Sequence, residues 1–115
     1  MEYLLMIHKD EAAWGSQTDE EKSAQMQAYG EFAGWVEGKG WMRGGARLHP
    51  TSEATTVRVR GGKTLSTDGP FAETKEQLGG YFLIECDDLD QAIEAASRIP
   101  GAARGSVEVR PVDQM

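Results

Sequence analysis

Hydrophobic and polar positions along this chain follow two periods, one typical of strands and one typical of helices. Residues 3–8 form an apolar run too short for a stable helix, and residues 80–86 form a second run of the same kind. In both runs the two alternating faces are mainly apolar. The pattern therefore predicts two central strands that are covered on both sides.

A β-hairpin is predicted in the middle of the chain. Residues 55–60 alternate between apolar and basic side chains, and the pair Gly61-Gly62 supplies a two-residue turn into residues 63–67. Two further strands are predicted, over residues 41–48 and over residues 106–112. In the first of them the pair Gly44-Gly45 indicates a bulge or a close backbone approach.

Two helices are predicted from capping signals and apolar spacing. Thr18 and Glu21 have the spacing of a capping box, and apolar residues then recur every three or four positions over residues 19–37. A second capping signal precedes a helix over residues 89–99. Residues 10–17, which contain glycine and serine, are expected to form a loop.

The order strand, helix, strand, hairpin, strand, helix, strand indicates an α+β fold with a ferredoxin-like split βαβ plan and an inserted β-hairpin. Two helices cover one face of such a sheet, whereas both faces of the central strands are apolar. We therefore expect the second face to pack on another copy, forming a homodimer that closes a dimeric α+β barrel around a pocket.

Composition narrows the class of protein. A chain of 115 residues with 39% apolar residues is expected to be a single domain over residues 1–115. The net charge of -7, without a Lys/Arg cluster, predicts no binding to nucleic acid or to an anionic membrane.

A cytoplasmic protein is favoured, because the sequence shows no long apolar stretch and no charged leader and has a single cysteine, Cys86. Two histidines and scattered carboxylates lack metal-ligand spacing, so we predict no metal and no cofactor.

The densest motif is Asp-Gly-Pro-Phe-Ala-Glu-Thr-Lys-Glu at residues 68–76. It resembles the DGPF-domain proteins of the YCII-related superfamily. The resemblance continues through residues 54–60, 77–81 and 89–93 and includes residues 11–14, so it covers nearly the whole chain. It implies a ferredoxin-like, dimeric α+β-barrel fold.

The resemblance also implies candidate chemistry. The superfamily is associated with a His and Asp acid/base pair, one relative is a dehydrochlorinase of a chlorinated hydroxyquinol, and the DGPF branch often accompanies extracytoplasmic-function sigma factors. Asp68 matches the aspartate. Relatives place the histidine on the first helix, but residues 19–37 contain none, and Tyr29 is the inward-facing polar candidate there. His49, in a loop before a proline, is a second candidate acid, ahead of His8.

Each candidate also has a structural interpretation. Asp68 can cap its own turn instead of acting as a base. Glu73, Lys75 and Glu76 can form exposed ion pairs in a surface turn, or they can converge on Asp68, with Lys75 holding a substrate anion. Both interpretations are open at this point.

The leading functional hypothesis is a cofactor-independent small-molecule enzyme that transfers a proton, of isomerase or lyase type. Asp68 would be the base, and His49 or Tyr29 the acid. The alternative is a non-catalytic ligand-binding or regulatory module that associates with an extracytoplasmic-function sigma factor. A purely structural dimer is a third reading.

Overall fold

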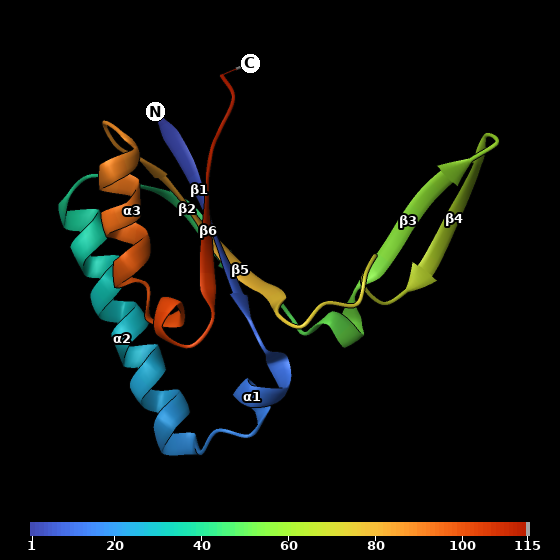
Figure 1. Cartoon of the computed structure of the whole chain (residues 1–115), viewed down its shortest axis with the longest axis horizontal. Helices are drawn as coiled ribbons and strands as arrows, with labels where there is room; N and C mark the ends of the chain where they lie inside the picture. The colour runs from blue at the N-terminus through green and yellow to red at the C-terminus, as the bar shows by residue number, and fades with distance from the viewer. Residues whose placement is uncertain (115) are drawn as a thin grey trace.

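A computed structural model describes residues 1–114 of the chain. Figure 1 shows a sheet with two long helices packed beside it and a hairpin that projects from this body. The elements in chain order are β1 (Glu2–Lys9), α1 (Glu11–Gly15), α2 (Asp19–Gly38), β2 (Met42–Arg47), η1 (Thr51–Glu53), β3 (Thr55–Arg60), β4 (Lys63–Asp68), β5 (Gln77–Glu85), α3 (Leu89–Arg98), η2 (Pro100–Ala103) and β6 (Ser106–Pro111).

The main sheet has the strand order β2-β5-β1-β6, and every neighbouring pair is antiparallel. This order confirms the predicted ferredoxin-like α+β plan, with β1 and β5 as the central strands and β3–β4 as the inserted hairpin. Both long helices begin where their capping signals predict. At α2 the Thr18 hydroxyl accepts a hydrogen bond from Glu21 N, and the Glu21 side chain accepts one from Thr18 N, which completes the capping box.

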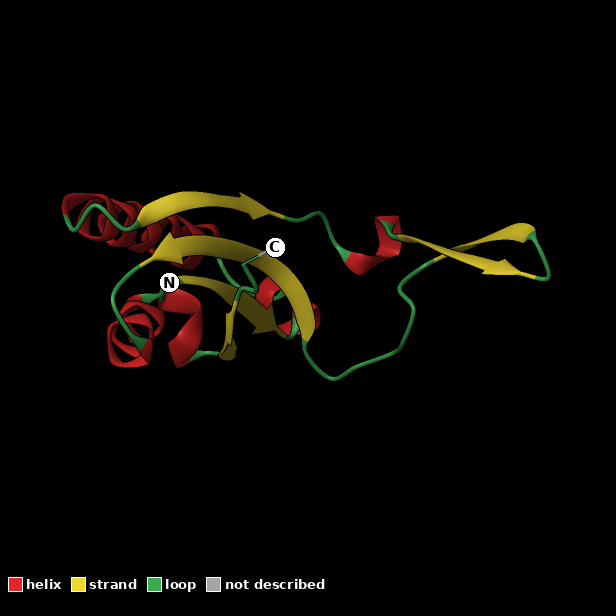
Figure 2. Cartoon of the chain, turned by 90° about the horizontal axis from the view of Figure 1, so that it is seen from above, coloured by secondary structure: helices red, strands yellow, loops and turns green. Residues whose placement is uncertain are grey.

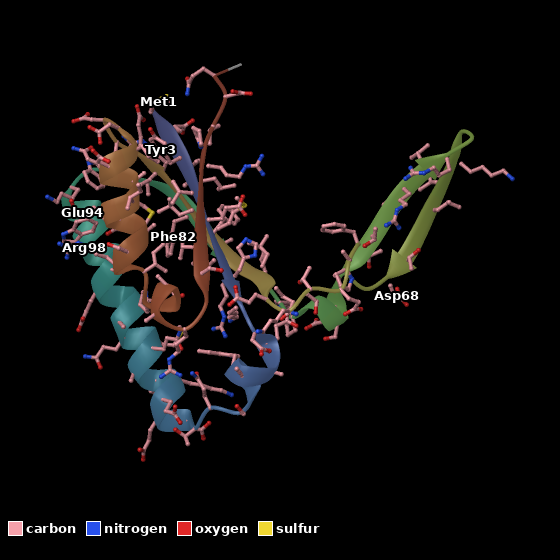
Figure 3. All side chains as sticks on the ribbon, viewed as in Figure 1. Met1, Tyr3, Asp68, Phe82, Glu94 and Arg98 are labelled. Carbon is pink, nitrogen blue, oxygen red and sulfur yellow. The ribbon has the colours of Figure 1, made fainter. Side chains whose placement is uncertain are left out.

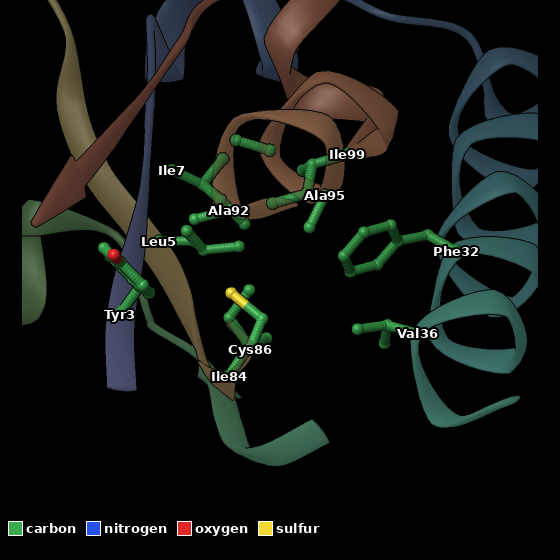
Figure 4. Close-up of a cluster of buried hydrophobic side chains, with 11 residues drawn as sticks. Tyr3, Leu5, Ile7, Phe32, Val36, Ile84, Cys86, Ala92, Ala95 and Ile99 are labelled. Carbon is green, nitrogen blue, oxygen red and sulfur yellow. The ribbon is translucent and has the colours of Figure 1, made fainter. Parts of the chain in front are cut away.

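The core lies between the helices and one face of the sheet (Figure 4). Its buried members are Tyr3, Leu5, Ile7, Phe32, Val36, Ile84, Cys86, Ala92, Ala95, Ala96 and Ile99. The single cysteine is part of this apolar core just after β5, and burial raises the pKa of its thiol.

The segment before α2 differs from the expected loop. Residues 11–15 form the short helix α1, because the Asp10 carboxylate accepts hydrogen bonds from Ala12 N at 3.0 Å and Ala13 N at 3.4 Å. A single helical turn is too short to show an apolar period, so the spacing of hydrophobic residues could not reveal it.

The bulge predicted from the glycine pair is present, as a register shift between Met42 and Gly44 in β2. Close packing of β2 on β5 depends on glycine. A Cβ atom on Gly80 would lie 2.8 Å from Ala46 O, and one on Gly45 would lie 2.9 Å from both Phe82 Cδ1 and Tyr81 O. These glycines let the two strands approach each other at one edge of the sheet.

The β3–β4 hairpin forms a separate two-stranded sheet that extends away from the rest of the molecule (Figure 2). Its turn has positive φ angles at Gly61 (58°) and Gly62 (77°), as the two-residue turn requires. At its base, Gly69 N donates to Ala54 O at 2.7 Å, and Thr56 Oγ1 donates to Gly69 O at 2.8 Å. The β3–β4 hairpin, called the arm below, is therefore closed by hydrogen bonds at its base and exposed to solvent along its length.

The second face of the main sheet carries half-buried apolar side chains of the two central strands. Leu4 and Met6 of β1 are paired with Leu83 and Tyr81 of β5 on this face. The two long helices lie on the opposite face (Figure 2). Among the described residues, no helix has the length and hydropathy of a membrane span.

Candidate functional site

A cavity of about 330 Å³ lies between the first half of α2, the short helix α1 and the strands β2 and β5. This volume is at the lower end of the range of about 300–1,000 Å³ that is usual for small-molecule sites. The cavity is lined by Ile7, Lys9, Trp14, Gln25, Met26, Tyr29, Gly45, Ala46, Arg47, Gly79, Gly80, Tyr81 and Phe82.

The wall of the cavity is mainly apolar and aromatic. The rings of Tyr29 and Phe82 are stacked with their centroids 6.5 Å apart, and Phe82 continues into the core against Phe32 at 5.0 Å. Glycines at the seam between β2 and β5 leave the opposite wall without side chains there. The same residues that allow close strand packing thus leave room for a ligand.

Three cationic side chains lie within 6 Å of the centroid of the Trp14 ring. Lys22 Nζ is 5.9 Å from it but Lys22 does not line the cavity, whereas Lys9 and Arg47 do. Lys9 Nζ lies 4.5 Å from the ring centroid, and Arg47 Cζ lies 5.6 Å from it. The pKa of Lys9 is lowered mainly by burial and then by the positive charge of Arg47, while the carboxylate of Glu11 acts in the opposite direction. The mouth of the cavity is therefore positively charged on an acidic chain.

Tyr29 lines the cavity, and its hydroxyl group lies close to Gly101. Burial raises the pKa of this phenol, although the backbone of Gly101, the charge of Arg47 and the side chain of Gln25 act in the opposite direction. The phenol is therefore protonated at neutral pH and can donate a hydrogen bond. Gln25 Oε1 is buried and has no hydrogen-bond partner among the described residues.

Helix α1, which carries Trp14, is attached to the rest of the fold by Glu11. The Glu11 carboxylate accepts hydrogen bonds from Thr51 N at 2.9 Å and from Thr51 Oγ1 at 2.8 Å. Glu11 N donates to Gln77 Oε1 at 3.0 Å. These bonds hold the Trp14 ring beside Lys9 and Arg47.

Of the three predicted catalytic residues, the structure places only Tyr29 in the cavity. Asp68 is the exposed last residue of β4, on the projecting hairpin (Figure 3). His49 is exposed, and its Nδ1 lies 3.1 Å from Glu53 Oε1. A single protomer therefore does not bring the three residues together, and their catalytic roles stay predictions.

The predicted substrate-binding residues lie in the turn between the hairpin and β5. Glu73 and Lys75 are exposed, and neither forms an ion pair within the part of the chain that the structure describes. Glu76 accepts a hydrogen bond from Ser106 Oγ at 2.6 Å. None of them has a contact with Asp68 among these interactions, and their role in binding a substrate stays a prediction.

No motif in the sequence marks the cationic mouth of the cavity. Lys9 and Arg47 are far apart in the chain and belong to no motif, and only the fold brings them to one ring. Trp14 belonged to the family resemblance but had no assigned role. The pair Gly44-Gly45 indicates a bulge or a close backbone approach, and it is the one signal in the sequence for this part of the cavity.

Among residues 1–114 no group of three or more His, Cys, Asp or Glu side chains is arranged to hold a metal ion.

Comparison with known proteins places the chain in a family. The model of the YCII-related domain matches residues 1–115. An uncharacterised protein of Rhizobium meliloti (strain 1021) is 41% identical over 117 aligned residues, which cover 97% of this chain and 92% of that protein. The chain therefore belongs to the YCII-related family.

Proposed function

We propose that this protein binds a small organic molecule in the cavity beneath α2 and transfers a proton on it, as a cofactor-independent enzyme of isomerase or lyase type. The observation that carries the proposal is Tyr29, a tyrosine with a raised pKa, in the wall of a partly enclosed, largely apolar cavity of ligand size. A buried phenol that keeps its proton at neutral pH can donate it, or a hydrogen bond, to an oxygen that gains negative charge in the reaction.

We further propose that the protein acts as a homodimer through the open face of its sheet, with Leu4, Met6, Tyr81 and Leu83 in the interface. Their apolar character supports this, since large exposed apolar sheet surfaces are unusual in monomers.

Asp68 is kept as the proposed base. Because it lies on an arm that projects from its own body, it would act at the cavity of the partner subunit.

A screen for hydrogen exchange tests the reaction. Small carbonyl compounds and organic acids are incubated with the protein in D₂O, and deuterium incorporation is followed by NMR. We expect Tyr29→Phe to slow exchange of a responsive compound by about 10²-fold or more, as is typical when a general acid is lost. Tyr3→Phe is the matched control, because it removes a hydroxyl from a buried tyrosine that does not line the cavity.

Full activity of Tyr29→Phe would remove Tyr29 from the mechanism, and full activity of Asp68→Asn would remove Asp68. If no compound exchanges, and a tagged protein instead retains a sigma factor in stoichiometric amount, the regulatory hypothesis replaces the enzymatic one.

A further inference from the structure

The two cations at the mouth of the cavity have no acidic partner. In the described part of the chain, neither Lys9 nor Arg47 forms an ion pair, whereas Arg43, Arg98 and Arg104 each pair with a glutamate. The chain has 19 acidic residues against 12 basic ones, so carboxylates are abundant. None of them lines the cavity.

The fold holds these two like charges close to one site. Both lie within 6 Å of the Trp14 ring centroid, at 4.5 Å for Lys9 Nζ and 5.6 Å for Arg47 Cζ. Lys22 Nζ, at 5.9 Å, adds a third positive charge at this ring, although Lys22 does not line the cavity. Apart from this ring, Arg47 Nη1 has only the weak acceptor Met26 Sδ, at 3.8 Å. The nearby carboxylate of Glu11 is already bound to Thr51 N and Oγ1. Burial of Lys9 and repulsion by Arg47 both disfavour the charged form of Lys9 and lower its pKa. An anion in the cavity would attract both cations and so favour that charged form.

The remaining lining indicates what the anion is attached to. The rings of Tyr29 and Phe82 and the glycine wall offer contacts to an apolar body, and a volume of about 330 Å³ limits its size. Inorganic phosphate has no apolar group that could contact this aromatic and glycine wall. The N-terminus of α2, which could otherwise attract a phosphate, is capped by Thr18 and Glu21 of the chain itself.

We infer that the ligand of this cavity is a small organic carboxylate, with its carboxylate group between Lys9 and Arg47 and its apolar body against the aromatic wall. This inference rests on the proposed function, since that function requires a small molecule in the same cavity. It adds the chemical class of that molecule and assigns binding roles to Lys9 and Arg47.

Binding of three probes to the full chain tests the inference, with ¹H–¹⁵N NMR shifts to locate each probe and to titrate its affinity. Benzoate has the charge and the ring, benzamide has the same shape without the charge, and inorganic phosphate has the charge without the ring. We expect benzoate to shift the cavity residues and to bind about tenfold or more tightly than benzamide, because hydrogen bonds to charged groups are the stronger ones. Phosphate is expected to bind more weakly than benzoate.

Lys9→Met and Arg47→Met should each weaken benzoate about tenfold while leaving benzamide unchanged. Lys39→Met is the matched control, because Lys39 Nζ also lies over aromatic rings, 5.6 Å from Trp35 and 5.8 Å from Trp41, but does not line the cavity. Equal affinity for benzoate and benzamide, an equal effect of Lys39→Met, or tighter binding of phosphate would overturn the carboxylate class and leave the proposed function standing. Binding of none of the organic probes in the cavity would overturn both.

Discussion

Single glycines control the edge of the sheet where the cavity lies. A side chain on Gly80 would meet the backbone oxygen of Ala46, which cannot move without displacing β2. At Gly101 an added Cβ would lie 2.8 Å from the hydroxyl of Tyr29 and 2.9 Å from Ile7 Cγ2. Absence of a side chain is therefore what permits both the strand spacing and the placement of the Tyr29 phenol.

Gly80→Ala should lower the free energy of unfolding by about 1–3 kcal/mol, the usual cost of overpacking. The reason is the 2.8 Å approach of the new Cβ to Ala46 O. Urea denaturation followed by circular dichroism measures the change. Gly34→Ala in α2 is the control, since nothing lies within 4 Å of its added Cβ, and there the helix should gain about 0.5–1 kcal/mol. A neutral or stabilising Gly80→Ala would show that β2 separates from β5 at little cost.

At the scale of elements, the start of α2 determines where the cavity residues Gln25, Met26 and Tyr29 lie. The capping box fixes Thr18 as the residue before the helix, and Tyr29 then falls on the side that faces the sheet. Hydrogen bonds from the backbone and side chain of Thr18 lower the pKa of Glu21, with a smaller effect of Arg104 in the same direction.

Thr18→Ala should lower the free energy of unfolding by about 1 kcal/mol, as is typical for loss of an N-cap. It should also change the pH dependence. Because the pKa of Glu21 is lower in the folded state than its ordinary 4.5, the unfolded chain binds more protons between the two values, and the stability from this group is lost as the pH falls through that window. In Thr18→Ala this loss should be smaller.

Thermal unfolding from pH 6 down to pH 3 measures both effects. Ser23→Ala is the control, because Ser23 is exposed in the same helix. An unchanged acid slope in Thr18→Ala would contradict a contribution of the Thr18 hydroxyl to the lowered pKa of Glu21, since the larger effect, from the Thr18 backbone, is kept in this variant.

The elements with a clear period or cap could be predicted from sequence, and the site largely could not. β1, β5, the two long helices and the Gly61-Gly62 turn each carry a local signal that the tertiary structure does not override. By contrast, Lys9 of β1 and Arg47 of β2 come to one aromatic ring only in the folded sheet, where β5 lies between their strands. α1 depends on one carboxylate cap, which a search for apolar periods does not register.

At the scale of the whole molecule, two features of the structure remain without a partner in a single protomer. One is the open sheet face with its half-buried apolar residues, and the other is the hairpin that extends into solvent (Figure 1). An isolated two-stranded hairpin is only marginally stable in water. A dimer that covers the open face and receives the arm would account for both.

Leu83→Asp should therefore dissociate the proposed homodimer. Placing an unpaired carboxylate in a buried apolar interface costs about 3–5 kcal/mol, so the dimer dissociation constant should rise by about 10²-fold or more. Sedimentation at micromolar concentration measures it, with circular dichroism to confirm that the variant is folded. Leu89→Asp is the control, because Leu89 is 49% exposed at the start of α3, on the helical side of the sheet. A wild-type chain that sediments only as a monomer would rule out the dimer, and with it any role of Asp68 at the cavity of the partner subunit.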